Sequence, residues 1–385
     1  MSKHPLWLVG FRPFFALACL SGIVLPIAWL PMFAGWIVAP GAAYTAIQWH
    51  AHEMFFGFGW AMLAGFLLTA SKNWVKIRGY HGGALVFLAA AWGFERLGMV
   101  FGAAWPPPLF LLSNQLFLVA VVTMLLWTLV RHRNADGYRR DNIYFLLLLP
   151  LFPVSKVLLL DGHWLHAGQL MALGLFRLAF LVMLERTVTE FMRGVFQATI
   201  LRHPLLDNAI KALALVMAFA GFLPPWAVAG LAVLLALLLL GRFAFWKPAL
   251  GFSRLDIGIM YMGYLAIVLQ LLVVAFEQAA QIVWVGSVSI HLFTFGAMGL
   301  IVPAMIVRIS KGHTGRKVSF EAADKAVLWL MIAALAFRVV APQILPGAYL
   351  LWVSLAAAGW AAAFALLAWR VVPFLLQARV DGREH

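Results

Sequence analysis

Residues 49–70 read WHAHEMFFGFGWAMLAGFLLTA, and this stretch decides the fold. Its second part belongs to an apolar run of the length that crosses a bilayer, which is about 20 residues. Its first part carries two histidines and a glutamate, His50, His52 and Glu53. Such groups are costly to bury in lipid, and inside a membrane span they usually serve a function. The stretch therefore predicts a membrane helix with a polar site near one end.

The composition of the whole chain supports a membrane protein. Of 385 residues, 64% are hydrophobic and 11% are charged, whereas a soluble protein has about 25% charged residues. The chain has too little polar surface to cover itself in water, so lipid must be part of its solvent. The single cysteine, Cys19, excludes an intramolecular disulfide and a metal site made of four cysteines.

Twelve apolar runs of about 20 residues divide the chain. We therefore predict an all-α, polytopic membrane helix bundle with about 12 transmembrane helices, forming a single domain over residues 1–385. Pro224 and Pro225 split one long run into a helical hairpin. The expected spans are 14–34, 50–70, 83–102, 109–130, 142–160, 167–185, 209–224, 226–245, 257–276, 284–307, 324–341 and 348–371.

The basic residues give the expected orientation. If the amino terminus is cytoplasmic, all but four of the 28 Lys and Arg residues fall on inside segments. This asymmetry is the positive-inside rule, and it predicts that both termini are cytoplasmic. The net charge of +14 then reflects topology and attraction to anionic lipid, and nucleic acid is excluded as a partner. The four exceptions fall within spans: Arg96, Lys156, Arg177 and Arg338.

The expected topology places nearly every embedded ionisable group in the outer half of the membrane. Because such groups are expensive in lipid, their gathering on one side predicts a functional site there. His163 and His166 lie in an outer connection, where an interfacial role is expected. The embedded groups on the outer side are His50, His52, Glu53, Glu95, Arg96, Lys156, His291 and Arg338.

Helical spacing indicates which of these groups share a face. Residues three apart lie on one face of an α-helix, so His50 and Glu53 face one way and His52 faces another. One metal ion therefore cannot easily take both histidines. The two axial ligands of a heme lie on opposite sides of the iron. His50 or His52 facing His291 from another helix would meet that requirement.

Two glycines extend this hypothesis on the helix of His291. Gly296 and Gly299 would permit close approach of a neighbouring helix or of a flat cofactor. Elsewhere the alternatives are structural. Glu95 and Arg96 would form ion pairs with other helices, and Lys156 would extend to the outer interface, as would Arg338.

A second candidate region is basic. Residues 308–320 read RISKGHTGRKVSF, in which Gly312 and Gly315 bracket His313. One interpretation is a basic loop that leaves a helix through a glycine C-cap. The other is a turn that binds an anionic group, such as a heme propionate, through backbone N–H groups and Arg316.

Five motifs together resemble those of the NnrS family of bacterial membrane proteins: GFRPFF at 10–15, WHAHEMFFGF at 49–58, HLFTFGAMG at 291–299, RISKGHTGR at 308–316 and DGRE at 381–384. The resemblance covers essentially the whole chain. It implies a twelve-helix inner-membrane protein that contains heme and copper and that acts in denitrification and in protection from nitric oxide and nitrosative stress. The motif match carries over six residues of interest: His50, His52, Glu53, His291, His313 and Arg316.

The leading hypothesis is a heme- and copper-binding protein of nitric oxide metabolism that reduces or scavenges nitric oxide. In this hypothesis His50, His52 and His291 hold metal, because imidazole binds both heme iron and copper. Glu53 orients a ligating imidazole or delivers protons. Lys156, the other candidate catalytic residue, Arg96 and Arg338 hold propionates or an anionic product. His313 and Arg316 complete the cofactor-binding set.

The expected partners are nitric oxide, membrane lipid and an electron donor that the sequence does not name. A rival hypothesis from another class is a secondary transporter or a heme- or metal-handling carrier, since twelve helices with embedded charges fit that class. Against it, the chain shows no convincing repeat, and its embedded charges are not gathered at the midplane. A third possibility is a metal-free stress-response or scaffold protein.

Overall fold

The computed structural model describes residues 4–40 and 44–383, and no β-strand occurs among them. Twelve of its helical segments are long and apolar enough to cross a membrane, which confirms the expected number. The α-helices are α1 (Phe11–Phe33), α2 (Ala46–His52), α3 (Trp60–Trp74), α4 (Gly83–Phe101), α5 (Pro107–Arg131), α6 (Ile143–Leu148), α7 (Leu151–Leu160), α8 (Leu165–Phe196), α9 (Pro204–Val216), α10 (Pro225–Phe245), α11 (Pro248–Phe252), α12 (Leu255–Ala280), α13 (Val288–His291), α14 (Gly299–His313), α15 (Ala322–Leu335), α16 (Ala341–Ile344) and α17 (Tyr349–Leu376).

Three spans contain a π-helical turn, a feature that the sequence analysis did not expect. The turns are Glu53–Gly59, Leu292–Met298 and Ala336–Val340. The first two begin directly after His52 and His291. A π-helical turn inserts an extra residue into an α-helix, and such turns frequently lie at functional sites. The two histidine motifs therefore coincide with breaks in the regular helical register.

The helices group into two compact units. The first comprises Met1–Leu165, Met305–Asp324 and Ala361–His385, and the second comprises His166–Ala304 and Lys325–Trp360. The first unit is thus built from both ends of the chain, together with a short middle segment.

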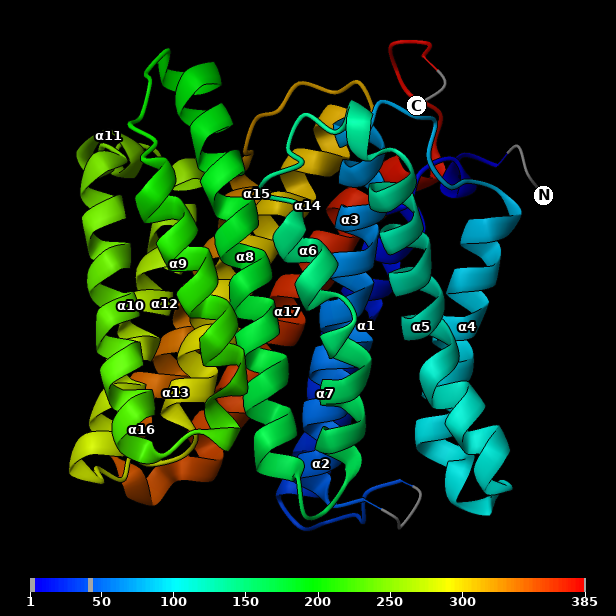
Figure 1. Ribbon diagram of the computed structural model, residues 1–385. Coiled ribbons are helices and arrows are strands. Elements are labelled where there is room, and N and C mark those ends of the chain that lie inside the picture. The colour runs from blue at the N-terminus through cyan, green and yellow to red at the C-terminus, as the bar shows by residue number, and fades with distance from the viewer. Residues whose placement is uncertain (1–3, 41–43, 384–385) are drawn as a thin grey trace. The chain divides into compact units, whose positions relative to one another are not determined.

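In the first unit, helices pack closely where glycines face aromatic rings. A Cβ atom on Gly22 of α1 would lie 2.5 Å from the ring of Phe364, and one on Gly65 of α3 would lie 2.9 Å from Phe14. Small residues at such positions let neighbouring helices approach closely in a membrane. Helices α4 and α5 pack side by side in the same unit (Figure 1).

The second unit packs α10 against α12 and α9 against α10. Helix α10 begins at Pro225 directly after Pro224, so the predicted proline hairpin is confirmed. Proline suits this position because its missing N–H would have no partner in the first turn of a helix.

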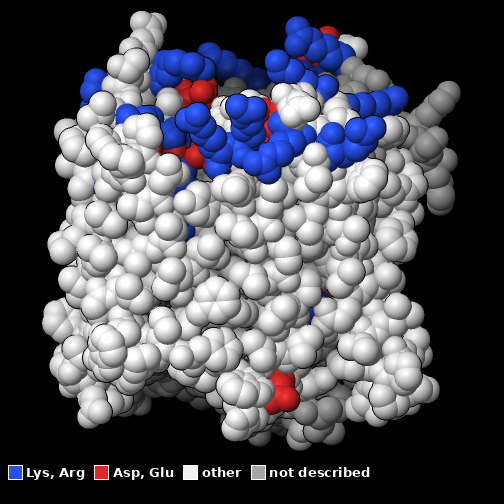
Figure 2. All heavy atoms as spheres, viewed as in Figure 1, with Lys and Arg blue, Asp and Glu red and all other residues white. Residues whose placement is uncertain are grey.

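Lysine and arginine side chains gather at one end of the helices on the face drawn in Figure 2, and a wide belt beside them is almost free of charge. In the first unit, Arg12 begins α1, Lys72 ends α3 and Arg131 ends α5. The basic residues thus lie at the start of the first span and at the ends of the second and fourth spans, which is one side of the membrane, as the positive-inside rule requires. We call this the basic end. The cytoplasmic orientation of the termini stays a prediction.

Candidate functional site

Five helical elements of the first unit bring polar side chains into one buried cluster. Helix α2, the π-helical turn Glu53–Gly59, α4, α5 and α7 each contribute to it. We call this cluster the buried network. It consists of His52, Glu53, Glu95, Arg96, Asn114 and Lys156.

The start of the second span positions this network. Thr45 caps α2 by accepting from the backbone N–H of Gln48, while the Gln48 side chain accepts from the backbone N–H of Thr45. This reciprocal capping box fixes where the helix begins. The Gln48 amide also donates to the carbonyl of Leu160 at the end of α7. Helices α2 and α7 are thereby tied together beside the network.

His52 is fully buried, and both of its ring nitrogens contact protein groups. Nδ1 lies 3.0 Å from Oε1 of Glu53, and Nε2 lies 3.1 Å from the side-chain amide nitrogen of Asn114. A carboxylate accepts and an amide N–H donates, so these two contacts fit a tautomer with its proton on Nδ1. Nε2 also lies 3.3 Å from Oε1 of Glu95. His52 therefore faces a carboxylate on each side.

The helical spacing suggested another grouping. It paired Glu53 with His50 and turned His52 away, whereas the structure pairs Glu53 with His52. The contact joins two neighbouring residues where α2 meets the π-helical turn, and a comparison of faces by three-residue spacing does not consider such a contact. His50 instead stacks on Trp29 of α1, with ring centroids 4.1 Å apart.

Two cations neutralise the two carboxylates of the network. Lys156 forms an ion pair with Glu95 and also donates to the backbone carbonyl of Asn114. Arg96 lies 2.9 Å from Glu95 and 3.3 Å from Glu53. A charge in a low-dielectric interior is tolerated when it is paired and hydrogen-bonded. The network is thus electrically balanced while His52 is neutral.

These contacts decide between the alternatives for the embedded charges. Glu95 and Arg96 do form ion pairs with other helices, as expected, and they also pair with each other. The interfacial alternative for Lys156 is wrong, because its side chain is fully buried. Arg338 is also buried, and in the second unit it donates to the hydroxyl of Tyr349.

A glycine makes room for Arg96. A Cβ atom on Gly57 would clash with the Nη1 atom of Arg96. The indole N–H of Trp92, one turn earlier on α4, donates to the carbonyl of Gly57 at 3.0 Å. The guanidinium of Arg96 lies 5.4 Å from the centre of the Trp92 ring. Gly57 is therefore required for the close contact between α4 and the π-helical turn.

Asn114 was not among the residues selected from the sequence, although it completes the network. Its amide nitrogen contacts His52, and its oxygen accepts from Gln115 at 3.0 Å. An amide carries no charge, so a pattern of embedded ionisable groups does not include Asn114. Two adjacent polar residues inside the apolar span Pro107–Arg131 were the signal that was available.

His291 lies in the second unit, so the hypothesis that it faces His50 or His52 stays a prediction. Its Nδ1 lies 2.7 Å from the backbone carbonyl of Ser287. A carbonyl can only accept, so Nδ1 carries the proton and Nε2 is the basic nitrogen. Metal-binding histidines commonly show this arrangement, in which a carbonyl orients the ring.

The glycines beside His291 accommodate neighbouring helices. A Cβ atom on Gly296 would lie 2.7 Å from Ala266, and one on Gly299 would lie 2.7 Å from Met331 and 2.9 Å from Trp360. Protein side chains therefore fill the space that a flat cofactor would need at these two positions. The sequence analysis gave Gly296 and Gly299 two possible neighbours, another helix or a flat cofactor. The close approach of a helix is confirmed.

His313 and Arg316 lie at the basic end of the first unit, apart from the buried network. The His313 ring lies 5.5 Å from the ring of Phe11, and the backbone N–H of Phe11 donates to the hydroxyl of Thr69. Thr69 and His52 lie on the same span, Ala46–Trp74, about 25 Å apart at the helical rise per residue. His52 and His313 therefore do not share one site.

The turn after His313 has the predicted glycine C-cap. Gly315 adopts a φ of +78°, and the N–H of Arg316 donates to the carbonyl of Lys311. The carboxylate of Asp381 packs against Gly315, at 2.8 Å from where a Cβ atom would stand. Asp381 belongs to the DGRE motif, of which Glu384 lies outside the described residues.

Electrostatic effects on this turn are local. The guanidinium of Arg379 holds the pKa of Asp381 at about 2, below its ordinary value. The same contact raises the pKa of Arg379. Burial lowers the pKa of Arg316.

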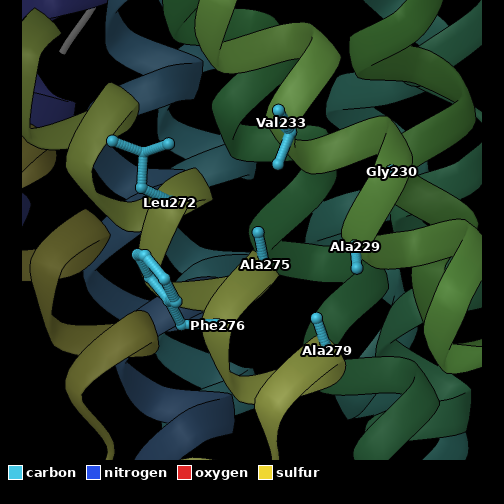
Figure 3. Close-up of a pocket in the computed structure, with 7 residues that line it drawn as sticks. All are labelled: Ala229, Gly230, Val233, Leu272, Ala275, Phe276 and Ala279. Atoms are coloured by element: carbon cyan, nitrogen blue, oxygen red, sulfur yellow. The ribbon is translucent and has the colours of Figure 1, made fainter.

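Two further observations bear on cofactors. Among residues 4–40 and 44–383, no three His, Cys, Asp or Glu side chains group together in a way that could hold a metal ion. An apolar groove of about 410 Å³ lies between α10 and α12 in the second unit (Figure 3). Ala229, Ala275, Phe276 and Ala279 are among the residues that line it. The groove offers no polar side chain to a metal or a propionate.

The twelve apolar helices and the buried charges define a multi-pass membrane protein. None of the curated proteins compared with this chain matches it. A family model described as NnrS protein matches residues 5–379, so the chain belongs to the NnrS family. The family that the motifs resemble is thereby confirmed.

Proposed function

We propose that this protein is a heme- and copper-binding protein of the bacterial inner membrane that acts in nitric oxide metabolism and in resistance to nitrosative stress. Membership of the NnrS family supports this proposal. The observation in the structure that carries it is the orientation of His291, whose Nδ1–H donates to the Ser287 carbonyl. This bond leaves Nε2 as the basic nitrogen that a heme iron requires.

In the first unit, His50 is the better candidate for a histidine that would hold heme, because the stack on Trp29 orients its ring. His52 does not fit this role as it stands, because Asn114 and Glu53 contact its two nitrogens. When bound, the heme would supply the iron that binds nitric oxide and exchanges an electron with it.

The proposal includes copper only because the resemblance to the NnrS family implies it. The described residues contain no group of three side chains suited to a metal ion. Neither His50 nor His291 appears in such a group.

The buried network can hold a proton. In the neutral state, Nε2 of His52 accepts from Asn114. In the protonated state, Nε2 would donate to Glu95, which lies 3.3 Å away. The change requires that the amide of Asn114 turn aside. Lys156 and Arg96 remain paired in both states, so His52 acts as the acid–base group and Glu53 orients its ring.

Glu95 provides a further acceptor in this network. Its Oε2 atom is buried and has no hydrogen-bond partner among the described residues. A buried acceptor without a partner costs about 1–3 kcal/mol. A water molecule that donates to Oε2 would offset this cost. Reduction of nitric oxide consumes protons, and a network that stores them fits an enzyme of this kind.

The optical spectrum of the purified protein, recorded with metal analysis before and after addition of nitric oxide, tests the proposal. We expect a Soret band that shifts when nitric oxide binds. His291→Ala should abolish the band, whereas His166→Ala, an exposed histidine of the same unit, should leave it unchanged. His52→Gln should retain the heme.

Other outcomes would reject the proposal or part of it. Protein purified from heme-replete cells without a Soret band would overturn the heme assignment and favour the transporter or carrier hypothesis. Full heme content in His291→Ala would show that the ligand assignment is wrong. Loss of heme in His52→Gln would restore that residue as a ligand.

A further inference from the structure

Three of the sequence motifs meet at the basic end of the first unit. Arg12 comes from GFRPFF, Arg316 from RISKGHTGR, and the segment that leads to DGRE carries Gln377. Nη1 of Arg12 donates to the carbonyl of Gln377 at 2.7 Å, and Nη2 of Arg316 donates to the side-chain oxygen of Gln377 at 2.8 Å. The two guanidinium groups thus contact one residue from two sides.

Further cations surround this pair. Arg379 donates to the carbonyl of His313 at 2.8 Å. Lys72 and Arg379 lie close enough for their positive charges to repel each other. Both charges also act on the ring of His313. We call these side chains the basic-end cluster. It consists of Arg12, Lys72, His313, Arg316 and Arg379.

The cluster has more positive charge than the protein neutralises. Within the part of the chain that the structure describes, Arg379 is the member with a carboxylate partner, Asp381. Arg316 packs its guanidinium 4.3 Å from the ring of Phe374, and its Nη1 atom has no hydrogen-bond partner there.

Arg12 is the most unusual member. Its side chain is fully buried, and its two charged neighbours are Arg316 and Arg379. The Nε and Nη2 atoms lack hydrogen-bond partners among the described residues. A buried charge that is not compensated is strongly unfavourable. Two buried guanidinium nitrogens, Nε and Nη2, are therefore available as donors to an acceptor.

Another buried basic residue of the basic end, Lys311, has its charge neutralised by a carboxylate. Lys311 is also buried, but it donates to the carboxylate of Asp324 at 2.7 Å and to the carbonyl of Ser319. The sequence thus supplies carboxylates to one buried cation at the basic end. It supplies carbonyls alone to Arg12, which leaves the positive charge for a ligand.

We propose that the basic-end cluster binds a phosphate group of an anionic ligand, with Arg12 and Arg316 as its principal donors. Guanidinium groups bind phosphate through paired N–H donors. The phosphate could belong to a lipid headgroup, because headgroups lie at this level of a membrane helix and anionic lipids attract basic segments. It could also be a free phosphate from solution.

Thermal unfolding of the detergent-purified full chain tests this proposal. One titration uses inorganic phosphate against sodium chloride at matched ionic strength. Another uses phosphatidylglycerol in mixed micelles against a neutral glycolipid. We expect stabilisation by at least one phosphate probe. Stabilisation by phosphatidylglycerol alone identifies a lipid headgroup, whereas stabilisation by inorganic phosphate identifies a ligand from solution.

Two variants and a matched control assign the site. Arg316→Gln should weaken the effective probe about tenfold or more, the effect of one lost charge-assisted hydrogen bond. Arg12→Gln should abolish the response, and Arg316→Gln decides the outcome if Arg12→Gln does not fold. Arg131→Gln removes the same charge from the exposed end of α5 and should leave the response unchanged. No stabilisation of the wild type, or equal responses of Arg316→Gln and Arg131→Gln, would overturn the proposal.

Discussion

Nε2 of His52 lies 3.3 Å from Oε1 of Glu95, so a histidine at the start of one span faces a carboxylate in the middle of another. Lys156 approaches the same oxygen from a third helix. Charges from separate helices are thereby collected in one buried place.

Glu95→Gln should strongly destabilise the protein. The substitution removes the carboxylate that pairs with the buried amine of Lys156, and breaking such a pair costs about 3–5 kcal/mol. Thermal or denaturant unfolding in detergent measures the loss. A double-mutant cycle with Lys156→Met should give a coupling free energy of roughly 1–3 kcal/mol.

The control for this cycle is an exposed pair. Glu190 and Arg193 face solvent one turn apart on α8, so Glu190→Gln should change stability by less than about 1 kcal/mol. Additive effects of Glu95→Gln and Lys156→Met would show that the buried ion pair contributes nothing.

Asn114→Leu should destabilise the protein by about 1–3 kcal/mol, because Nε2 of His52 would lose its donor in a buried place. Unfolding measurements report the change. Gln115→Leu removes a bond to Asn114 but keeps the contact with His52, so its effect should be smaller. If Gln115→Leu were the more damaging of the two, the assigned role of Asn114 would be wrong.

Gly57→Ala should displace Arg96 and weaken its contacts with Glu53 and Glu95, since the new methyl group would occupy the place of the guanidinium. We expect a loss of about 1–3 kcal/mol, as for overpacking in a core. Gly93→Ala is the matched control on α4, because no atom lies near the position of its Cβ. Equal stabilities for the two variants would contradict the proposed fit.

The carboxyl-terminal segment should loosen at low pH. The pKa of Asp381 is lowered in the folded protein to about 2, so its pair with Arg379 contributes stability above the unfolded pKa of about 3.9. This contribution is lost as the pH falls through about 2. Hydrogen exchange of the Val380 amide, which donates to the Thr314 carbonyl at 3.1 Å, measures the loosening.

Asp381→Asn is the control for this measurement. Its Val380 amide should exchange faster than in the wild type at pH 5, and the protection should not change further between pH 4 and 2 once intrinsic rates are removed. Identical protection in the variant and the wild type would show that the ion pair does not hold the segment.

The spans could be predicted because the bilayer imposes a length and a composition on each of them. The expected range 226–245 and the observed helix Pro225–Phe245 differ by one residue. The sixth span, Leu165–Phe196, extends well beyond the expected 167–185. Arg186 and the polar residues after it continue the helix past the apolar part, and hydropathy does not report such an extension.

The contacts at the candidate site could not be predicted. The sequence marks His50, His52 and Glu53 as important, but their contacts depend on side chains from α1, α4 and α5. Packing against α4 and the space beside Gly57 accompany the π-helical turn that begins at Glu53. Periodicity within one segment contains no information about such neighbours.

The contacts at the basic end were equally inaccessible. Arg12 and its acceptor Leu375 are separated by 363 positions in the sequence. A pattern confined to a short window cannot indicate that they meet. The motifs themselves were recognised individually, while their common location came from the structure.

The way in which the first unit is assembled has a consequence for biosynthesis. A ribosome makes the chain from its amino terminus, so the carbonyls that accept from Arg12 are made long after it: Leu375 follows Arg12 by 363 positions and Gln377 by 365. The first unit, which contains His52, must therefore wait until the segment from Ala361 onward has been made before its packing is complete. A product that stopped before Leu375 would leave Nη1 of Arg12 without these two acceptors.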